Sequence, residues 1–152
     1  MDSFSPVDYT VRENFDGSAS VILGNLNLTN NIEYNIIVTL RPDSSRIETE
    51  IRTFNTSLIP ERYYFWSNAA ISTSYGLKIF YPGHQTNIGS FPIDENGVDL
   101  SLYRNYVRPT SLFMLDSEED FFAAYNYDYD MGVVHVADHN MVPGKKFWTW
   151  GT

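Results

Sequence analysis

The chain has 152 residues, of which 43% are hydrophobic and 16% aromatic, and it carries a formal net charge of −9. This length suits one ordinary domain, and the composition is that of a globular protein. The acidic balance disfavours nucleic acid and anionic membranes as partners. The absence of cysteine excludes disulfides, thiolate zinc sites and a cysteine nucleophile. Because no signal-peptide pattern and no apolar segment of about 18 residues are present, we expect a cytoplasmic protein.

The first third of the chain predicts a series of β-strands. Residues 7–13 and 18–28 alternate between apolar and polar side chains, and Asp16-Gly17 between them predicts a hairpin turn. Residues 33–40 are rich in β-branched side chains, and residues 46–54 alternate again. Each of these four segments is therefore expected to form a strand.

The aromatic segment 62–72 predicts a further strand, which carries Trp66 and Asn68. After a short expected strand at 76–81, regular alternation is lost as far as about Ser111. Irregular segments of this length in compact domains are usually binding loops or interfaces.

That irregular segment contains two candidate ligand-binding residues, His84 and Asp99. Beyond it, Ser117–Ala124 is the best helix candidate, since it opens with a capping-like Ser-Glu-Glu-Asp, but it is short. No segment shows sustained helical periodicity, so the chain predicts an all-β, antiparallel β-sandwich. Residues 1–152 are expected to form a single domain.

The twenty residues Gly132–Gly151, near the C-terminal end, gather unusual chemistry into two expected strands. The first strand places His135 and His139 on one face, and Pro143-Gly144 then turns the chain to close a hairpin. One face of the second strand carries Lys146, Trp148 and Trp150.

His135 and His139 have the spacing of a helical metal pair, but four residues of strand separate them by roughly 13 Å, too far to share one ion. We therefore expect no metal site and no cofactor. His135 is either a sheet histidine that bonds a neighbour or a group that grips a polar ligand.

The tryptophans allow two interpretations. Indoles two residues apart on a strand face form either half of a sandwich core or a platform for a flat, partly apolar ligand. A sugar suits such a platform, because its C–H face stacks on indole while its hydroxyls bond groups such as Lys146 and Asn68. Composition alone favours the core.

Four segments carry a family resemblance: NTSLIPERYYFWSNAAIS at 55–72, IFYPGH at 79–84, FPIDENGVDLS at 91–101 and VHVADHNMVPGKKFWTWG at 134–151. With these the chain resembles a bacterial domain family of unknown function that often occurs beside tetratricopeptide repeats. That family is similar in fold to galactose mutarotase, a β-supersandwich. The resemblance implies a sugar-binding fold, of which this chain would be the N-terminal part.

In mutarotases an asparagine, a proline and an aromatic strand carry a sugar-contacting histidine. Here Asn55, Pro60 and the strand at 62–72 resemble that segment, and Asn68 occupies the histidine's position. The resemblance implies that the mutarotase glutamate base would lie beyond Thr152, so it implies sugar binding more than epimerase activity.

The leading hypothesis is thus a carbohydrate-binding domain with a saccharide ligand. Its expected binding residues are Trp66, Asn68, His84, Asp99, His135, Lys146, Trp148 and Trp150. An aldose epimerase or another carbohydrate-active enzyme is an alternative, with His84, His135 and His139 as catalytic candidates. Another alternative is an interaction module that packs against a partner domain. An exposed sheet would also favour a homodimer.

Overall fold

The computed structural model describes residues 6–63 and 66–152. Within these ranges the regular structure consists of β-strands and one 3-10 turn, η1 (Tyr103–Asn105), and every strand pairing is antiparallel. The predicted all-β, antiparallel class is confirmed. No helix in the described part of the chain is long and apolar enough to cross a membrane.

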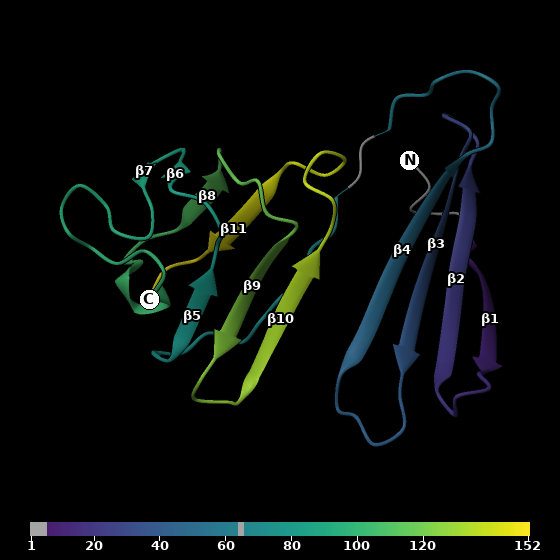
Figure 1. Cartoon of the computed structure of the whole chain (residues 1–152), viewed down its shortest axis with the longest axis horizontal. Coiled ribbons are helices and arrows are strands. Elements are labelled where there is room, and N and C mark those ends of the chain that lie inside the picture. Colours follow the sequence, from purple (N-terminus) through teal and green to yellow (C-terminus); the bar gives the residue numbers. More distant parts are fainter. Residues whose placement is uncertain (1–5, 64–65) are drawn as a thin grey trace. The chain divides into compact units, whose positions relative to one another are not determined.

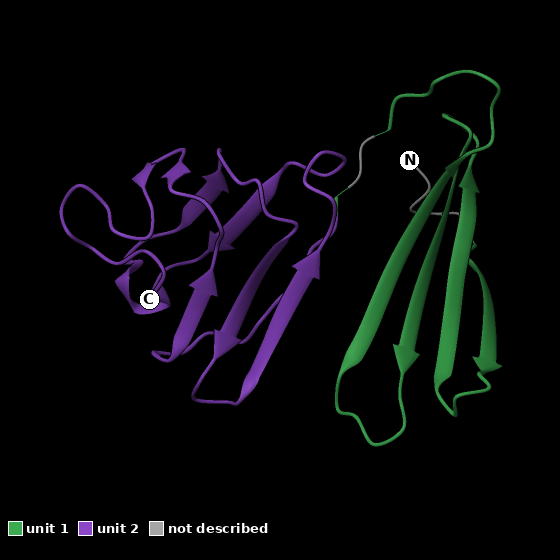
Figure 2. Ribbon diagram, viewed as in Figure 1, with its two compact units in different colours: residues 1–66 green, residues 67–152 purple. Residues whose placement is uncertain are grey.

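Contacts divide the chain into two compact units, residues 1–66 and residues 67–152 (Figure 2). The single domain expected over 1–152 stays a prediction. Each unit is built on its own sheet or sheets.

The first unit is a four-stranded sheet in which neighbours along the chain pair in order (Figure 1). Its strands are β1 (Asp8–Glu13), β2 (Ala19–Asn27), β3 (Ile32–Leu40) and β4 (Ile47–Asn55). They confirm the four predicted strand segments to within two residues. The Asp16-Gly17 turn is also confirmed: Gly17 has φ 79°, a left-handed conformation that favours glycine, and its N–H donates to Asn14 O over 3.0 Å.

The register of this sheet separates an apolar face from a polar one. Val11, Val21 and Val38 pair across three strands in one row. The adjacent row, which points to the opposite face, consists of Arg12, Ser20 and Thr39. Strand alternation therefore makes this sheet amphipathic.

The second unit contains two antiparallel sheets. One has the order β10-β9-β5 and the other β11-β8-β6-β7. The strands are β5 (Leu77–Phe80), β6 (Gln85–Thr86), β7 (Gly89–Ser90), β8 (Thr110–Met114), β9 (Phe121–Asn126), β10 (Met131–Val136) and β11 (Lys145–Thr149).

Residues from both sheets of the second unit share one core. Ile79 of β5 and Phe122 of β9 pack with Leu112 of β8 and Phe147 of β11. Tyr81, directly after β5, adds edge-on contact to Phe91, with ring centroids 5.9 Å apart. This shared core gives the unit the sandwich-like layering that the sequence predicted.

Two predicted elements are wrong. No strand forms at 62–72 in its described residues, so Trp66 and Asn68 lie outside any sheet. The short helix candidate Ser117–Ala124 overlaps β9, in which Phe122 and Ala124 point into the core in strand alternation, and this agrees with the all-β prediction.

The expected hairpin over Gly132–Gly151 is the second error. β10 pairs with β9, whereas β11 pairs with β8 in the other sheet. The connecting segment turns at Asp138, whose carbonyl accepts the N–H groups of Met141 and Val142 over 3.1 and 2.8 Å. The two strands therefore lie in different layers of the sandwich.

Candidate functional site

Two tryptophans lie exposed at the end of β11. Trp148 is 44% exposed and Trp150 is 76% exposed, so the core interpretation is wrong for both. Their ring centroids are 4.4 Å apart and the ring planes meet at 75°, an edge-to-face arrangement. Both indoles thus offer apolar surface that the described chain leaves uncovered.

Strand β8 extends this surface. Lys146 pairs with Phe113, and the Lys146 Nζ lies 5.0 Å from the centre of the Phe113 ring. Trp148 pairs with Ser111 in the same register. We call the group Phe113, Lys146, Trp148 and Trp150 the aromatic platform.

The opposite face of β11 carries a buried lysine. The burial pattern of the strand places Lys145, Phe147 and Thr149 inward. Lys145 is only 3% exposed, and its Nζ has no hydrogen-bond partner within the described residues. A buried ammonium without an acceptor is costly, so this position is chemically unusual.

His135 of β10 lies within the electrostatic reach of that ammonium. Its ring stacks at a tilt on Phe122, the residue opposite it on β9, with centroids 5.1 Å apart. Burial, and secondarily the positive charge of Lys145, lowers the pKa of His135 below its ordinary value. His135 is therefore neutral at pH 7 and keeps one N–H donor.

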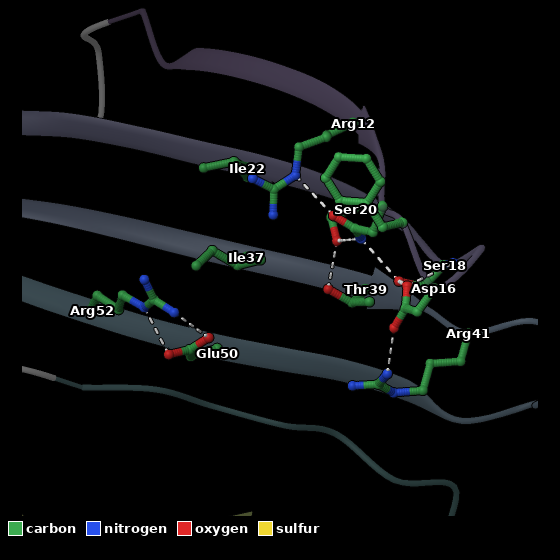
Figure 3. A pocket seen from close by; sticks show the side chains of 12 residues that line it. Arg12, Asp16, Ser18, Ser20, Ile22, Ile37, Thr39, Arg41, Glu50 and Arg52 are labelled. Carbon is green, nitrogen blue, oxygen red and sulfur yellow. Dashed lines mark hydrogen bonds and ion pairs between the residues drawn. The ribbon is translucent and has the colours of Figure 1, made fainter.

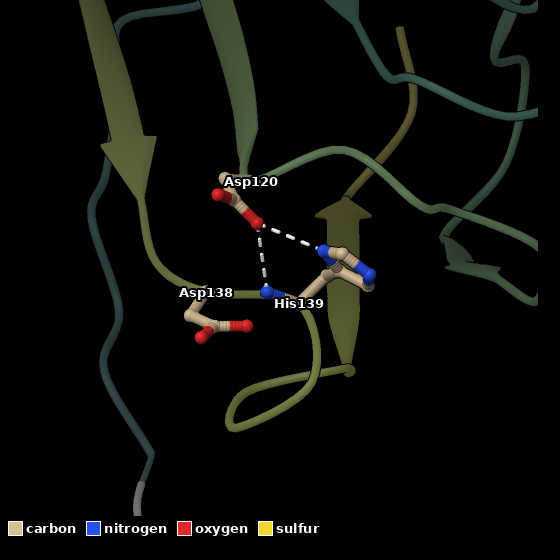
Figure 4. Close-up of side chains that lie close together, drawn as sticks. All are labelled: Asp120, Asp138 and His139. Carbon is tan, nitrogen blue, oxygen red and sulfur yellow. Dashed lines mark hydrogen bonds and ion pairs between the residues drawn. The ribbon is translucent and has the colours of Figure 1, made fainter.

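Asp120 and His139 form a carboxylate–imidazole pair (Figure 4). One oxygen of Asp120 accepts both the backbone N–H and the Nδ1 of His139, each over 2.9 Å. The hydrogen bond from the His139 ring contributes most to lowering the pKa of Asp120. The backbone bond and the charges of His139 and Lys145 lower it further. Since the ionised carboxylate only accepts, Nδ1 must donate to it, and in the uncharged form of the ring Nε2 is then the proton acceptor.

Asp120, Asp138 and His139 place potential metal ligands within 4.8 Å of one another. Protein donors already engage two of the three groups: Asp120 accepts from His139, and one Asp138 oxygen accepts from the backbone and side chain of Asn140 over 2.8 and 3.1 Å. The positive charge of Lys145 also opposes a cation here.

The structure brings together three of the residues that the sequence proposed, Lys146, Trp148 and Trp150. His135 instead points inward from the other sheet of the sandwich. Asp99 stabilises the loop in which it lies, because its carboxylate accepts hydrogen bonds from the N–H and the hydroxyl of Ser101 over 2.9 and 2.7 Å.

The remaining proposed residues lie outside the strands. His84 is exposed, and its backbone N–H donates to Asp116 over 3.0 Å. Trp66 is the last residue of the first unit, and Asn68 lies in an exposed segment near the start of the second.

The polar face of the first unit forms a shallow hollow of about 480 Å³ (Figure 3). Three arginines line it, and each already has a partner. Arg12 donates to Asn14 over 2.8 Å, Arg41 to Asp16 over 3.0 Å, and Arg52 pairs with Glu50. The hydroxyls of Ser20 and Thr39 also form a hydrogen bond of 2.8 Å with each other. These polar groups of the hollow therefore already have partners within the protein.

Sequence reasoning missed Phe113, Asp120 and Lys145. Strand alternation could have found Lys145, since a Lys-Lys pair in a strand must place one ammonium inward when the other points outward. The contact between Asp120 and His139 joins residues 19 positions apart and has no local signal.

No solved structure matches the chain. A family model described as a domain of unknown function (DUF5107) matches residues 2–152, which is nearly the whole sequence. The chain belongs to this family, the domain of unknown function DUF5107.

Proposed function

We propose that this chain is a carbohydrate-binding domain that holds a saccharide on the aromatic platform. The observation that carries the proposal is the exposure of Trp148 and Trp150 side by side on an outer sheet face. Contiguous exposed aromatic surface on a folded domain marks binding sites more often than chance. The sequence resemblance to galactose-mutarotase-like folds points to the same ligand class.

The chemistry of the platform matches a pyranose ring. The apolar C–H face of the sugar would stack on an indole, while a sugar hydroxyl would accept from the Lys146 ammonium. Phe113 broadens the apolar surface beside that ammonium. An open platform of this kind gives weak binding to a single sugar, with a Kd on the order of 1 mM, and tighter binding to a chain that covers both indoles.

Titration of glucose, galactose and their β-linked tetrasaccharides against intrinsic tryptophan fluorescence tests the proposal. Trp148→Ala removes a ring contact worth about 1 to 2 kcal/mol and should weaken binding about 5- to 30-fold. Phe121→Ala, an exposed aromatic on the other sheet, is the matched control and should leave affinity unchanged. Absence of any spectral change with every sugar would remove the proposal.

The Asp120–His139 pair favours a second candidate, an aldose epimerase or related carbohydrate-active enzyme. Anomer interconversion needs a proton acceptor at the anomeric hydroxyl and a proton donor at the ring oxygen. His139, oriented by Asp120, offers Nε2 as the acceptor, and His135 offers an N–H.

Polarimetry of freshly dissolved glucose and galactose tests this second candidate. Wild-type protein should speed mutarotation, and His139→Ala should return the rate to that of buffer. Asp120→Asn should lower the rate while leaving sugar affinity unchanged. A wild-type rate equal to buffer would end the epimerase proposal but not the binding proposal.

A further inference from the structure

Strand β10 is an edge strand of the second unit. In the sheet order β10-β9-β5, one side of β10 pairs with β9, and no strand of the unit's described residues pairs with the other side (Figure 1). An edge strand presents backbone N–H and C=O groups that can pair with another chain, so proteins usually guard it with charges, proline, short length or a covering segment. An edge without such a guard is a candidate site for strand pairing.

The other sheet edges in the described residues carry such guards. The outer strands of the first unit, β1 and β4, each contain three charged side chains. β5 is covered by a loop, since the N–H of Ile79 donates to Ser101 O over 2.7 Å. β7 has two residues, and β11 carries Lys145 and Lys146. In contrast, β10 reads MGVVHV and contains no Asp, Glu, Lys, Arg or Pro.

The hydrogen bonds between β10 and β9 show which backbone groups point to the outer edge. Ala137 and Asp120 continue the register of the two strands, and the Ala137 N–H donates to Asp120 O over 2.7 Å. In an antiparallel ladder, hydrogen-bonded and non-hydrogen-bonded pairs alternate. Every second residue before Ala137 therefore bonds to β9, and the residues between them direct their N–H and C=O outward. These are Gly132, Val134 and Val136.

We propose that the outer edge of β10 pairs with β10 of a second copy of this chain, antiparallel about a two-fold axis. In such a pairing, if one residue faces a second, the second also faces the first. With Val134 facing Val134 of the other copy, Gly132 faces Val136, and each of these three pairs exchanges two backbone hydrogen bonds. An axis one residue to either side leaves only two such pairs within the strand, so the Val134 register is preferred.

The side chains on the outer face of β10 suit this register. Val134 and Val136 are both exposed. The two copies of Val134 would be direct neighbours and would join the row Phe80, Ala123 and Val134 of each copy into one continuous apolar row. Val136 would face Gly132, which has no side chain that could clash. The pairing therefore covers apolar side chains as well as backbone groups.

The charge of the chain favours a second copy as the occupant of this edge only if the contact itself is uncharged. Two chains of net charge −9 repel each other, so their interface needs a surface without carboxylates. β10 meets this condition, and a copy of β10 matches it in length and in pattern. A single strand pair is a small contact, so we expect a weak dimer with a Kd on the order of 10 μM.

The dimer does not depend on carbohydrate binding, because β10 and the aromatic platform belong to different sheets of the second unit. The two proposals can therefore fail separately.

Single cysteine variants test the register, because the chain contains no cysteine. Val134→Cys places two thiols opposite each other with their Cα atoms about 5.5 Å apart, within the range of a disulfide. Val136→Cys separates them by about 13 Å along the strands. Under mild oxidation with diamide, Val134→Cys should form a covalent dimer at least tenfold faster than Val136→Cys. Val107→Cys, at an exposed loop valine, gives the rate of random collision. Equal rates for the three variants would overturn the proposal.

Sedimentation equilibrium from about 5 to 500 μM measures the dimer of the unmodified chain. Val134→Lys should raise the dimer Kd at least tenfold, because two ammonium groups would meet at the axis. Val107→Lys adds the same charge to a valine that is 80% exposed and should leave the Kd within twofold of wild type.

Hydrogen exchange of wild-type protein keeps the proposal testable if Val134→Lys does not fold. The amides of Gly132, Val134 and Val136 should exchange more slowly at high protein concentration, whereas the amide of His135, which bonds to β9, should not change. A monomer at every concentration would mean that the edge does not pair with a second copy and would overturn the proposal. Outward amides whose exchange is independent of concentration would overturn it as well.

Discussion

Replacing the buried ammonium of Lys145 by a thioether should stabilise the protein. Lys145 is 3% exposed and its Nζ has no acceptor in the described chain. Folding therefore removes the charge from water, and no hydrogen bond offsets the cost of this desolvation. Replacing buried charged groups by apolar ones of similar volume is often stabilising by about 1 to 4 kcal/mol. With about 2 kcal/mol taken as the gain, Lys145→Met should raise Tm by about 4 to 8 °C for a chain of this size.

Thermal unfolding followed by circular dichroism at pH 7.5 measures this gain. Lys146→Met is the control on the same strand, and it should lower stability only slightly, by about 0.5 to 1 kcal/mol, because it loses the exposed contact with Phe113. A Tm for Lys145→Met below that of wild type would refute the reasoning, since it would mean that the ammonium is satisfied in the folded protein.

Three more predictions concern other parts of the molecule. Because the pKa of His135 is lowered in the folded protein, the unfolded chain binds more protons, and the free energy of unfolding should fall as pH drops below about 6.5. In His135→Gln the denaturation midpoint should depend less on pH in that range. Asn126→Ala should lower the free energy of unfolding, measured in urea, by about 2 to 3 kcal/mol, because it leaves Ser72 and Ser74 without their buried hydrogen-bond partner. Val134 and Val136 are 66% and 72% exposed on one sheet face, so light scattering should show a dimer that Val136→Lys weakens; a monomer at all concentrations would contradict this.

Local signals predicted the first unit well. Alternation over β1, β2 and β4 sets the period of a strand, and Asp16-Gly17 meets the geometry of a tight turn at Gly17 φ 79°. Because each strand pairs with its neighbour along the chain, little information beyond the local pattern was needed.

The second unit depends on contacts that local patterns do not encode. A strand needs a hydrogen-bonding partner, and the segment 62–72 has the composition of a strand but joins no sheet in its described residues. β10 and β11 have correct alternation, yet their partners are β9 and β8, in separate layers. The capping-like start at Ser117 is followed by strand β9, in which Phe122 packs against the core.

In the candidate site, too, the local pattern predicted which residues share a strand face but not which elements surround them. The outward row Lys146, Trp148 and Trp150 follows from strand period alone. The exposure of that row does not, because it depends on whether a second layer covers it. Alternation also places Lys145 on the opposite face, but the pairing of Asp120 with His139 required the three-dimensional arrangement.

The most direct test of carbohydrate binding is an NMR titration of the indole N–H signals of the three tryptophans. A β-linked glucose or galactose tetrasaccharide should shift the signals of Trp148 and Trp150 together with one saturation curve, and Trp148→Ala should remove the shift of Trp150. Indole signals that do not move with either tetrasaccharide, at concentrations up to about ten times the expected millimolar Kd, would contradict the proposed function.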